Sequence, residues 1–152
     1  MSHIEYNLMP QGQILQDFSD CRARNSFIMG PLGSGKTVQC ILKLFDLMCE
    51  QAPVNDQSHK NYGVRLSRVI AARNTYSELF STTIKDWLEI HGELGDFKQG
   101  NKEPPTHYIR FNLEDGTRVE CDVIFIAFDR PEHVKKARGI QTTWVKIIGT
   151  LN

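Results

Sequence analysis

The sequence has few cysteines, no excess charge of either sign and no long apolar run, and each shortage excludes a class of protein. Its four cysteines form no C-x-x-C pair, so we expect neither a zinc site nor a disulfide framework. Lys+Arg and Asp+Glu each number 18, and this balance excludes a protein that coats nucleic acid by charge alone. The longest apolar run, Val123–Phe128, is far shorter than the ~20 residues of a membrane helix.

The length and composition of the chain are typical of a globular domain. The chain has 152 residues, of which 40% are apolar and 24% charged, which suits one domain with a core of its own. Residues 1–11 have neither the basic lead nor the apolar stretch of a signal peptide. Scattered thiols are typical of a reducing compartment. We therefore expect a soluble cytoplasmic protein.

Strand and helix periods alternate along the chain, which predicts an α/β fold. Thr75 and Glu78 have the spacing of a capping box. An Asp-Gly turn at Glu114–Gly116 lies between two alternating apolar runs, which indicates a β-hairpin. The predicted elements are helices over 7–24, 36–48 and 75–90, strands over 26–29, 67–73 and 142–148, the hairpin over 107–128, and loops over 50–63 and 92–105.

One motif carries chemistry. The run Gly30-Pro31-Leu32-Gly33-Ser34-Gly35-Lys36-Thr37 matches G-x-x-x-x-G-K-[ST] in full, between an apolar run and an amphipathic helical pattern. Glycines allow the backbone N–H groups to surround a phosphate, and the helix N-terminus adds a favourable dipole. Lys36 would hold the β/γ-phosphates, and the Thr37 hydroxyl would bind Mg²⁺. The loop predicts nucleoside triphosphate binding and does not choose between ATP and GTP.

Hydrolysis would also need an acidic residue at the end of a neighbouring buried strand. Asp129 directly follows Val123–Phe128, and Glu132 comes three residues later. The alternative is that Asp129 caps a helix over 130–138. Arg73, after the second predicted strand, would either face the nucleotide or pair with a local carboxylate.

A basic run follows Asp129. Five basic residues lie within nine positions. They would contact a nucleic-acid backbone or a phosphate, or they form a solvated face. They are Arg130, His133, Lys135, Lys136 and Arg138.

Taken together, these segments resemble the N-terminal ATPase domain of the large terminase subunit of tailed bacteriophages, the motor that packages DNA into the procapsid. The resemblance spans about residues 6–145 and is most specific around Phe128–Lys136 and Arg138-Gly139. It also rests on Pro10-Gln11-Gly12-Gln13, which is similar to the family's adenine-side segment, on the loop, on Ala72–Leu79 and on Thr82–Trp87.

The resemblance implies a P-loop NTPase-type three-layer fold with a mostly parallel central sheet, helices on both faces and one antiparallel hairpin. It also implies ATP and Mg²⁺ as cofactors, with Gln13 on the adenine side and Gly30 to Thr37 around the phosphates. The implied partners are the small terminase subunit, the portal and double-stranded DNA, in the cytoplasm of the bacterial host. We expect direct DNA contact by this chain to be weak and a membrane to play no part.

The chain departs from the family pattern near its end. In the family, the strand around Trp144-Val145 ends in an acidic pair, whereas Lys146 and Ile147 stand here. The family's loop often carries an arginine where Pro31 and Leu32 stand. We therefore expect a partial ATPase domain over 1–152, with a lead-in over 1–25, a core over 26–152 and no nuclease domain. A sheet that lacks its last strands would expose an apolar edge and favour self-association.

Three hypotheses follow from the sequence. The first is a truncated packaging ATPase that binds ATP and hydrolyses it poorly. The second is a complete small P-loop NTPase or kinase that uses Asp129 as its acid, although the loop over 92–105 lacks the arginines of a kinase lid. The third is a non-catalytic nucleotide-binding assembly protein.

Overall fold

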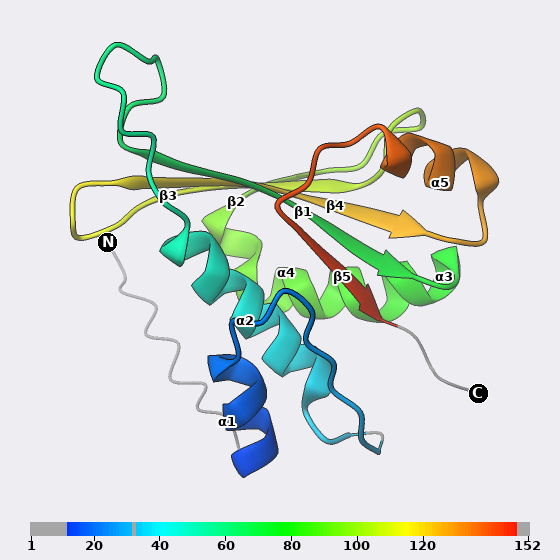
Figure 1. Cartoon of the computed structure of the whole chain (residues 1–152). Helices are drawn as coiled ribbons and strands as arrows, with labels where there is room; N and C mark the ends of the chain where they lie inside the picture. The colour runs from blue at the N-terminus through cyan, green and yellow to red at the C-terminus, as the bar shows by residue number, and fades with distance from the viewer. Residues whose placement is uncertain (1–11, 32, 149–152) are drawn as a thin grey trace. The chain divides into compact units, whose positions relative to one another are not determined.

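The computed structural model of the chain describes residues 12–31 and 33–148, the last four by their backbone alone. The chain divides into two compact units, Met1–Lys43 and Leu44–Asn152, with the boundary inside a helix. Figure 1 shows the elements of each unit. No helix in the described part has both the length and the apolar character needed to cross a membrane.

The first unit contains helix α1 (Gln13–Asp20) and the start of helix α2 (Lys36–Glu50). The Lys43 ammonium joins the two, because it donates hydrogen bonds to the Phe18 carbonyl at 2.7 Å and to Ser26 Oγ at 3.1 Å. It also lies 4.2 Å from the centre of the Phe18 ring. Burial lowers the pKa of Lys43. The predicted helix over 7–24 is thus present only as Gln13–Asp20 in the described residues.

The predicted strand over 26–29 is wrong. These residues belong to no strand, and Phe27 is 88% exposed. A strand requires a hydrogen-bonded neighbour, and a short apolar run without one gains nothing from its β-propensity. The apolar run has the composition of a strand, but the sequence pattern does not show whether a neighbouring strand is available to pair with it.

The second unit is built on one sheet with the strand order β2-β3-β4-β1-β5. Two pairings are parallel (β1 with β4 and with β5) and two are antiparallel (β2 with β3 and β3 with β4). The sheet is therefore mixed rather than mostly parallel with one antiparallel pairing. Its strands are β1 (Val64–Arg73), β2 (Gly95–Lys98), β3 (Thr106–Asn112), β4 (Arg118–Ala127) and β5 (Trp144–Ile148).

The predicted hairpin is confirmed as β3 and β4. Its turn is closed by the Leu113 N–H, which donates to the Thr117 carbonyl at 2.8 Å. Asp115 accepts hydrogen bonds from the Thr117 hydroxyl and N–H, and these bonds lower the pKa of Asp115 to about 2. Gly116 has a φ of +84°, which an L side chain rarely adopts.

Strand β2 lies in the segment that the sequence predicts to be a loop. Gly95 begins it, and a Cβ built at Gly95 would lie 1.9 Å from the Tyr108 carbonyl oxygen. Only glycine allows this approach of β2 to β3. Glycine is usually typical of a loop, but at position 95 it makes the pairing of these two strands possible.

Helices cover both faces of the sheet (Figure 1). One face packs on the helical segment after β1, which consists of α3 (Tyr76–Glu78), the π-helical turn η1 (Leu79–Ile84) and α4 (Lys85–His91), followed by the short 3-10 turn η2 (Gly92–Leu94). On the other face, Ala137 of α5 (Pro131–Arg138) packs with Ile140 against Ile70, Ala72 and Ile126. These layers confirm the α/β class.

The predicted N-terminal cap of the helix after β1 is also confirmed, since Thr75 Oγ1 accepts from the Glu78 N–H at 3.3 Å.

The centre of the second unit combines aromatic packing with one buried polar pair. Trp87 is 1% exposed, and its ring lies 6.1 Å from that of Phe125. Its Nε1–H donates to Nδ1 of His107, which is 0% exposed, at 2.9 Å. Burial lowers the pKa of His107, so the neutral ring is favoured.

Candidate functional site

The glycine-rich loop of the first unit contains two glycines with a left-handed backbone. Gly33 and Gly35 have φ values of +75° and +78°, in the left-handed region, and α2 begins directly after them at Lys36. A loop of this shape turns sharply into a helix N-terminus, where backbone N–H groups favour an anion. Leu32 lies outside the described residues.

The Lys36 side chain lies over its own loop. Its ammonium donates hydrogen bonds to the Pro31 carbonyl and to Ser34 Oγ, the second at 2.9 Å. Lys36 is the only charged residue between Gly30 and Thr37. The loop thus concentrates one positive charge, two left-handed glycines and a helix start within eight residues.

Helix α1 begins beside this loop. A Cβ built at Gly35 would lie 3.7 Å from Leu15 Cδ1. Gln13, the residue implied on the adenine side, is the first residue of α1, and its Nε2 donates to Asp17 Oδ1 at 2.6 Å. Residues 10 and 11 of the similar segment lie outside the described residues, so the adenine-side assignment stays a prediction.

Arg73 and Asp129 lie in the second unit, where β1 and β4 end. Because the two strands are parallel, their carboxyl ends meet at one edge of the sheet, where open α/β folds place ligands. The Arg73 Nε is 3.6 Å from Glu78 Oε2. Of the two roles considered for Arg73, the structure shows the ion pair with a local carboxylate.

The Asp129 carboxylate bonds to the start of a different helix from the one the sequence suggests. Its Oδ2 accepts from the Tyr76 N–H at 3.0 Å, at the start of the helical segment after β1. The N-cap residue of α5 is Arg130, which makes no side-chain capping bond. The expected cap over 130–138 is therefore wrong in its target, because the sequence cannot show that β1 and β4 end side by side.

Strand β5 carries the positions at which the family resemblance expects an acidic pair. Lys146 is paired with Ala71 and Ile147 with Ala72, so both lie near the same carboxyl edge. Among the residues that the structure describes, no group of three or more His, Cys, Asp or Glu side chains could hold a metal ion.

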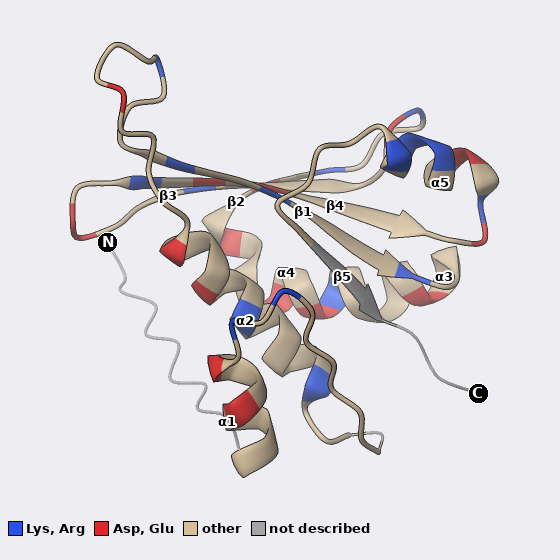
Figure 2. Ribbon diagram, in the orientation of Figure 1, with Lys and Arg blue, Asp and Glu red and all other residues tan. Residues whose placement is uncertain are grey.

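The basic residues of α5 gather in its last turn. Lys135, Lys136 and Arg138 lie there, and Figure 2 shows the helix as a concentration of positive charge. The Lys136 ammonium also donates to the Lys102 carbonyl, which brings the loop after β2 to α5. Arg130 is engaged differently, since its guanidinium lies 4.2 Å from the centre of the Tyr76 ring.

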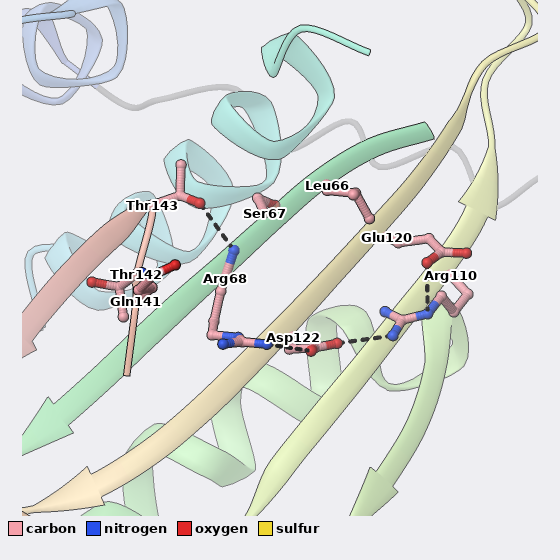
Figure 3. Close-up of a pocket in the computed structure, with 9 residues that line it drawn as sticks. All are labelled: Leu66, Ser67, Arg68, Arg110, Glu120, Asp122, Gln141, Thr142 and Thr143. Atoms are coloured by element: carbon pink, nitrogen blue, oxygen red, sulfur yellow. Dashed lines mark hydrogen bonds and ion pairs between the residues drawn. The ribbon is translucent and has the colours of Figure 1, made fainter. Parts of the chain in front are cut away.

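A polar groove of about 460 Å³ on one sheet face was missed by the sequence analysis (Figure 3). Its charges form a ladder across three strands: Arg110 Nη2 lies 2.9 Å from Asp122 Oδ1, and Arg68 Nη2 lies 3.8 Å from Asp122 Oδ2. Arg110 Nε is also 3.7 Å from Glu120 Oε2. The groove is lined by Leu66, Ser67, Arg68, Arg110, Glu120, Asp122, Gln141, Thr142 and Thr143.

This ladder is explained by register. Arg68 is directly opposite Asp122 and Arg110 directly opposite Glu120 in the sheet, so opposite charges meet across strands. Partly exposed pairs of this kind contribute about 0–1 kcal/mol each. The sequence shows only that charged residues alternate with apolar ones along the predicted strands. Which charges pair depends on contacts between residues far apart in the chain.

No family model, curated protein or solved structure gives a significant match to this chain.

Proposed function

We propose that the chain is an ATP-binding module of the kind found in the packaging ATPase of phage terminases, with weak hydrolysis of its own, acting in the cytoplasm of a bacterial host. The observation that carries the proposal is the loop Gly30–Thr37, in which a full phosphate-binding motif is joined to left-handed Gly33 and Gly35 and to the start of α2. The terminase assignment rests on sequence resemblance alone.

In this proposal each loop residue has a role in binding rather than in bond cleavage. Backbone N–H groups from Gly33 to Thr37 would surround the β-phosphate, and the Lys36 ammonium would neutralise charge on the β/γ-phosphates. Mg²⁺, with Thr37 as a ligand, would supply further charge neutralisation when bound. Gln13 would face the adenine.

Weak hydrolysis is what the family resemblance implies, because it expects an acidic pair at positions 146 and 147. Positions 146 and 147 carry Lys and Ile rather than carboxylates. One oxygen of Asp129 accepts from the Tyr76 N–H, and Arg73 is paired with Glu78. Loss of one electrostatic group of this kind typically slows a reaction by about 10²–10³.

The binding of phosphates can be tested by comparing nucleotides of different length. We expect displacement of a fluorescent ATP analogue to require less ATP or GTP than AMP, because the loop contacts β- and γ-phosphates. Equal displacement by AMP and ATP would contradict a phosphate-binding loop. Tighter binding of ATP than of GTP would support the adenine role of Gln13.

A second candidate function is a small P-loop kinase or NTPase with Asp129 as the acid. The observation in its favour is the place of this exposed carboxylate at the ends of two parallel strands. Measured turnover in Asp129 variants separates it from the first proposal. Nucleotide binding with no turnover and no DNA dependence would instead favour an assembly protein.

The proposed partners are the small terminase subunit, the portal and double-stranded DNA. Direct contact with DNA would use the cationic end of α5, which carries Lys135, Lys136 and Arg138. Since the net charge of the chain is zero, only such a local patch can attract a phosphate backbone, and we expect the contact to be weak.

A further inference from the structure

The loop Gly30–Thr37 contains a closed set of hydrogen bonds that uses the ammonium group assigned above to phosphate. Lys36 Nζ donates to the Pro31 carbonyl and, at 2.9 Å, to Ser34 Oγ. Ser34 Oγ in turn donates to the same Pro31 carbonyl at 2.8 Å. Three polar groups of one loop are therefore bonded to one another.

Gly30 completes this arrangement because it has no side chain. A Cβ built at Gly30 would lie 3.3 Å from Ser34 Oγ and 3.8 Å from Lys36 Nζ. The hydroxyl and the ammonium can therefore lie close to the loop backbone. The Ser34 hydroxyl both accepts from Lys36 and donates to Pro31, so its single proton is committed to the loop.

We propose that Ser34 is a positioning residue whose hydroxyl holds the Lys36 ammonium on the loop and so lowers the affinity of the loop for a triphosphate. This inference rests on the proposed function. An ammonium group has three N–H donors, and two of them are directed at Pro31 and Ser34. A phosphate must compete with these two oxygens for the ammonium. The measured affinity for a triphosphate is therefore reduced by the free energy needed to break the hydrogen bonds of Lys36 to the loop.

The first test compares the binding of MgATP and of inorganic tripolyphosphate to the wild type, Ser34→Ala and Ser34→Thr by calorimetry. Ser34→Ala removes the hydroxyl and should bind both ligands about two- to tenfold more tightly, the equivalent of one net hydrogen bond. Ser34→Thr keeps the hydroxyl and should bind as the wild type does. Lys36→Ala shows how much of the affinity depends on the ammonium.

The second test needs no nucleotide. Limited acetylation by an amine-reactive ester, read by peptide mass spectrometry, measures how accessible and free each lysine is. Lys36 should be acetylated several-fold faster in Ser34→Ala than in the wild type or in Ser34→Thr. Lys60, an exposed lysine of the second unit, provides the internal reference and should react equally in all three.

The outcomes are distinguishable. Faster Lys36 acetylation with tighter binding supports the inference. Weaker binding in Ser34→Ala would overturn it and make the hydroxyl a phosphate ligand instead, and unchanged acetylation would overturn it as well. Faster acetylation with no nucleotide binding by any variant would show that Ser34 restrains the Lys36 ammonium. The same result would contradict the proposed function and, with it, the expected effect of Ser34 on affinity.

Discussion

The Asp129 carboxylate accepts a hydrogen bond from the Tyr76 N–H at 3.0 Å, which ties the end of β4 to the first residue of the helix that follows β1. The Asp129 N–H also donates to the Asn74 carbonyl at 3.0 Å. Two bonds thus join segments more than fifty residues apart in the sequence, at the carboxyl edge of the sheet.

Asp129→Ala should lower the free energy of unfolding by about 0.5–1.5 kcal/mol, because it removes this hydrogen bond, while Asp129→Asn should lower it less, since the amide oxygen still accepts from the Tyr76 N–H. Urea denaturation measures both. Steady-state phosphate release should be low in the wild type and unchanged in Asp129→Asn. A turnover near ~1 s⁻¹ that collapses in Asp129→Asn would show that Asp129 is the acid and would favour the second candidate function.

The approach of β2 to β3 gives a prediction with a matched control. Gly95→Ala should destabilise the protein by about 1–3 kcal/mol, because the added methyl group meets the Tyr108 carbonyl and forces the strands apart. Gly100→Ala, in the neighbouring loop, meets nothing within 4 Å and should be close to neutral. Equal stability of the two variants in chemical denaturation would contradict the pairing of β2.

Several parts of the fold could be predicted from local signals. The Asp-Gly turn, the Thr75 cap and the apolar run before Asp129 each depend on neighbouring residues, and the structure contains the hairpin, the capped helix and the buried strand β4. Strand β2 could not be predicted, since its pairing depends on Gly95 meeting Tyr108 in three dimensions.

The same distinction applies to the candidate site. The loop motif is local, and Gly35, one of its two pattern glycines, has a left-handed φ of +78° in the structure. The bond of Asp129 to Tyr76, and the charged ladder from Arg68 to Glu120, depend on strand order and register. Sequence spacing carries no direct information on either.

The buried pair of Trp87 and His107 predicts a pH dependence of stability. The pKa of His107 is lowered by burial, so below the unfolded value of about 6.5 the unfolded chain binds more protons than the folded one. This contribution to stability is present above pH ~6.5 and is lost as the pH falls through that value toward the folded pKa.

Urea unfolding between pH 5.5 and 7.5 should show stability rising with pH, with a slope of at most about 1.4 kcal/mol per pH unit from one proton. His107→Gln, which keeps an acceptor for Trp87, should reduce this slope. His59→Gln, at an exposed histidine, should retain it. An identical slope in the wild type and His107→Gln would contradict the assignment.

Binding to DNA should depend steeply on salt. Removing one lysine that binds a phosphate should reduce the slope of log K against log salt concentration by about one. Lys135→Ala combined with Lys136→Ala should therefore weaken binding and flatten the slope by up to about two, as measured by fluorescence anisotropy on a duplex. Lys60→Ala removes a charge elsewhere and should change neither quantity. Tight binding that is insensitive to salt would exclude a contact made through this patch.

The most direct measurement of the central claim is calorimetric titration of MgATP into the wild-type chain and into Lys36→Ala, with Lys60→Ala as the charge-matched control. We expect the wild type and Lys60→Ala to bind with the same affinity, and Lys36→Ala to bind at least tenfold more weakly, because it loses the only fixed charge of the loop. Equal affinity in the wild type and Lys36→Ala, or no binding to the wild type, would contradict the account.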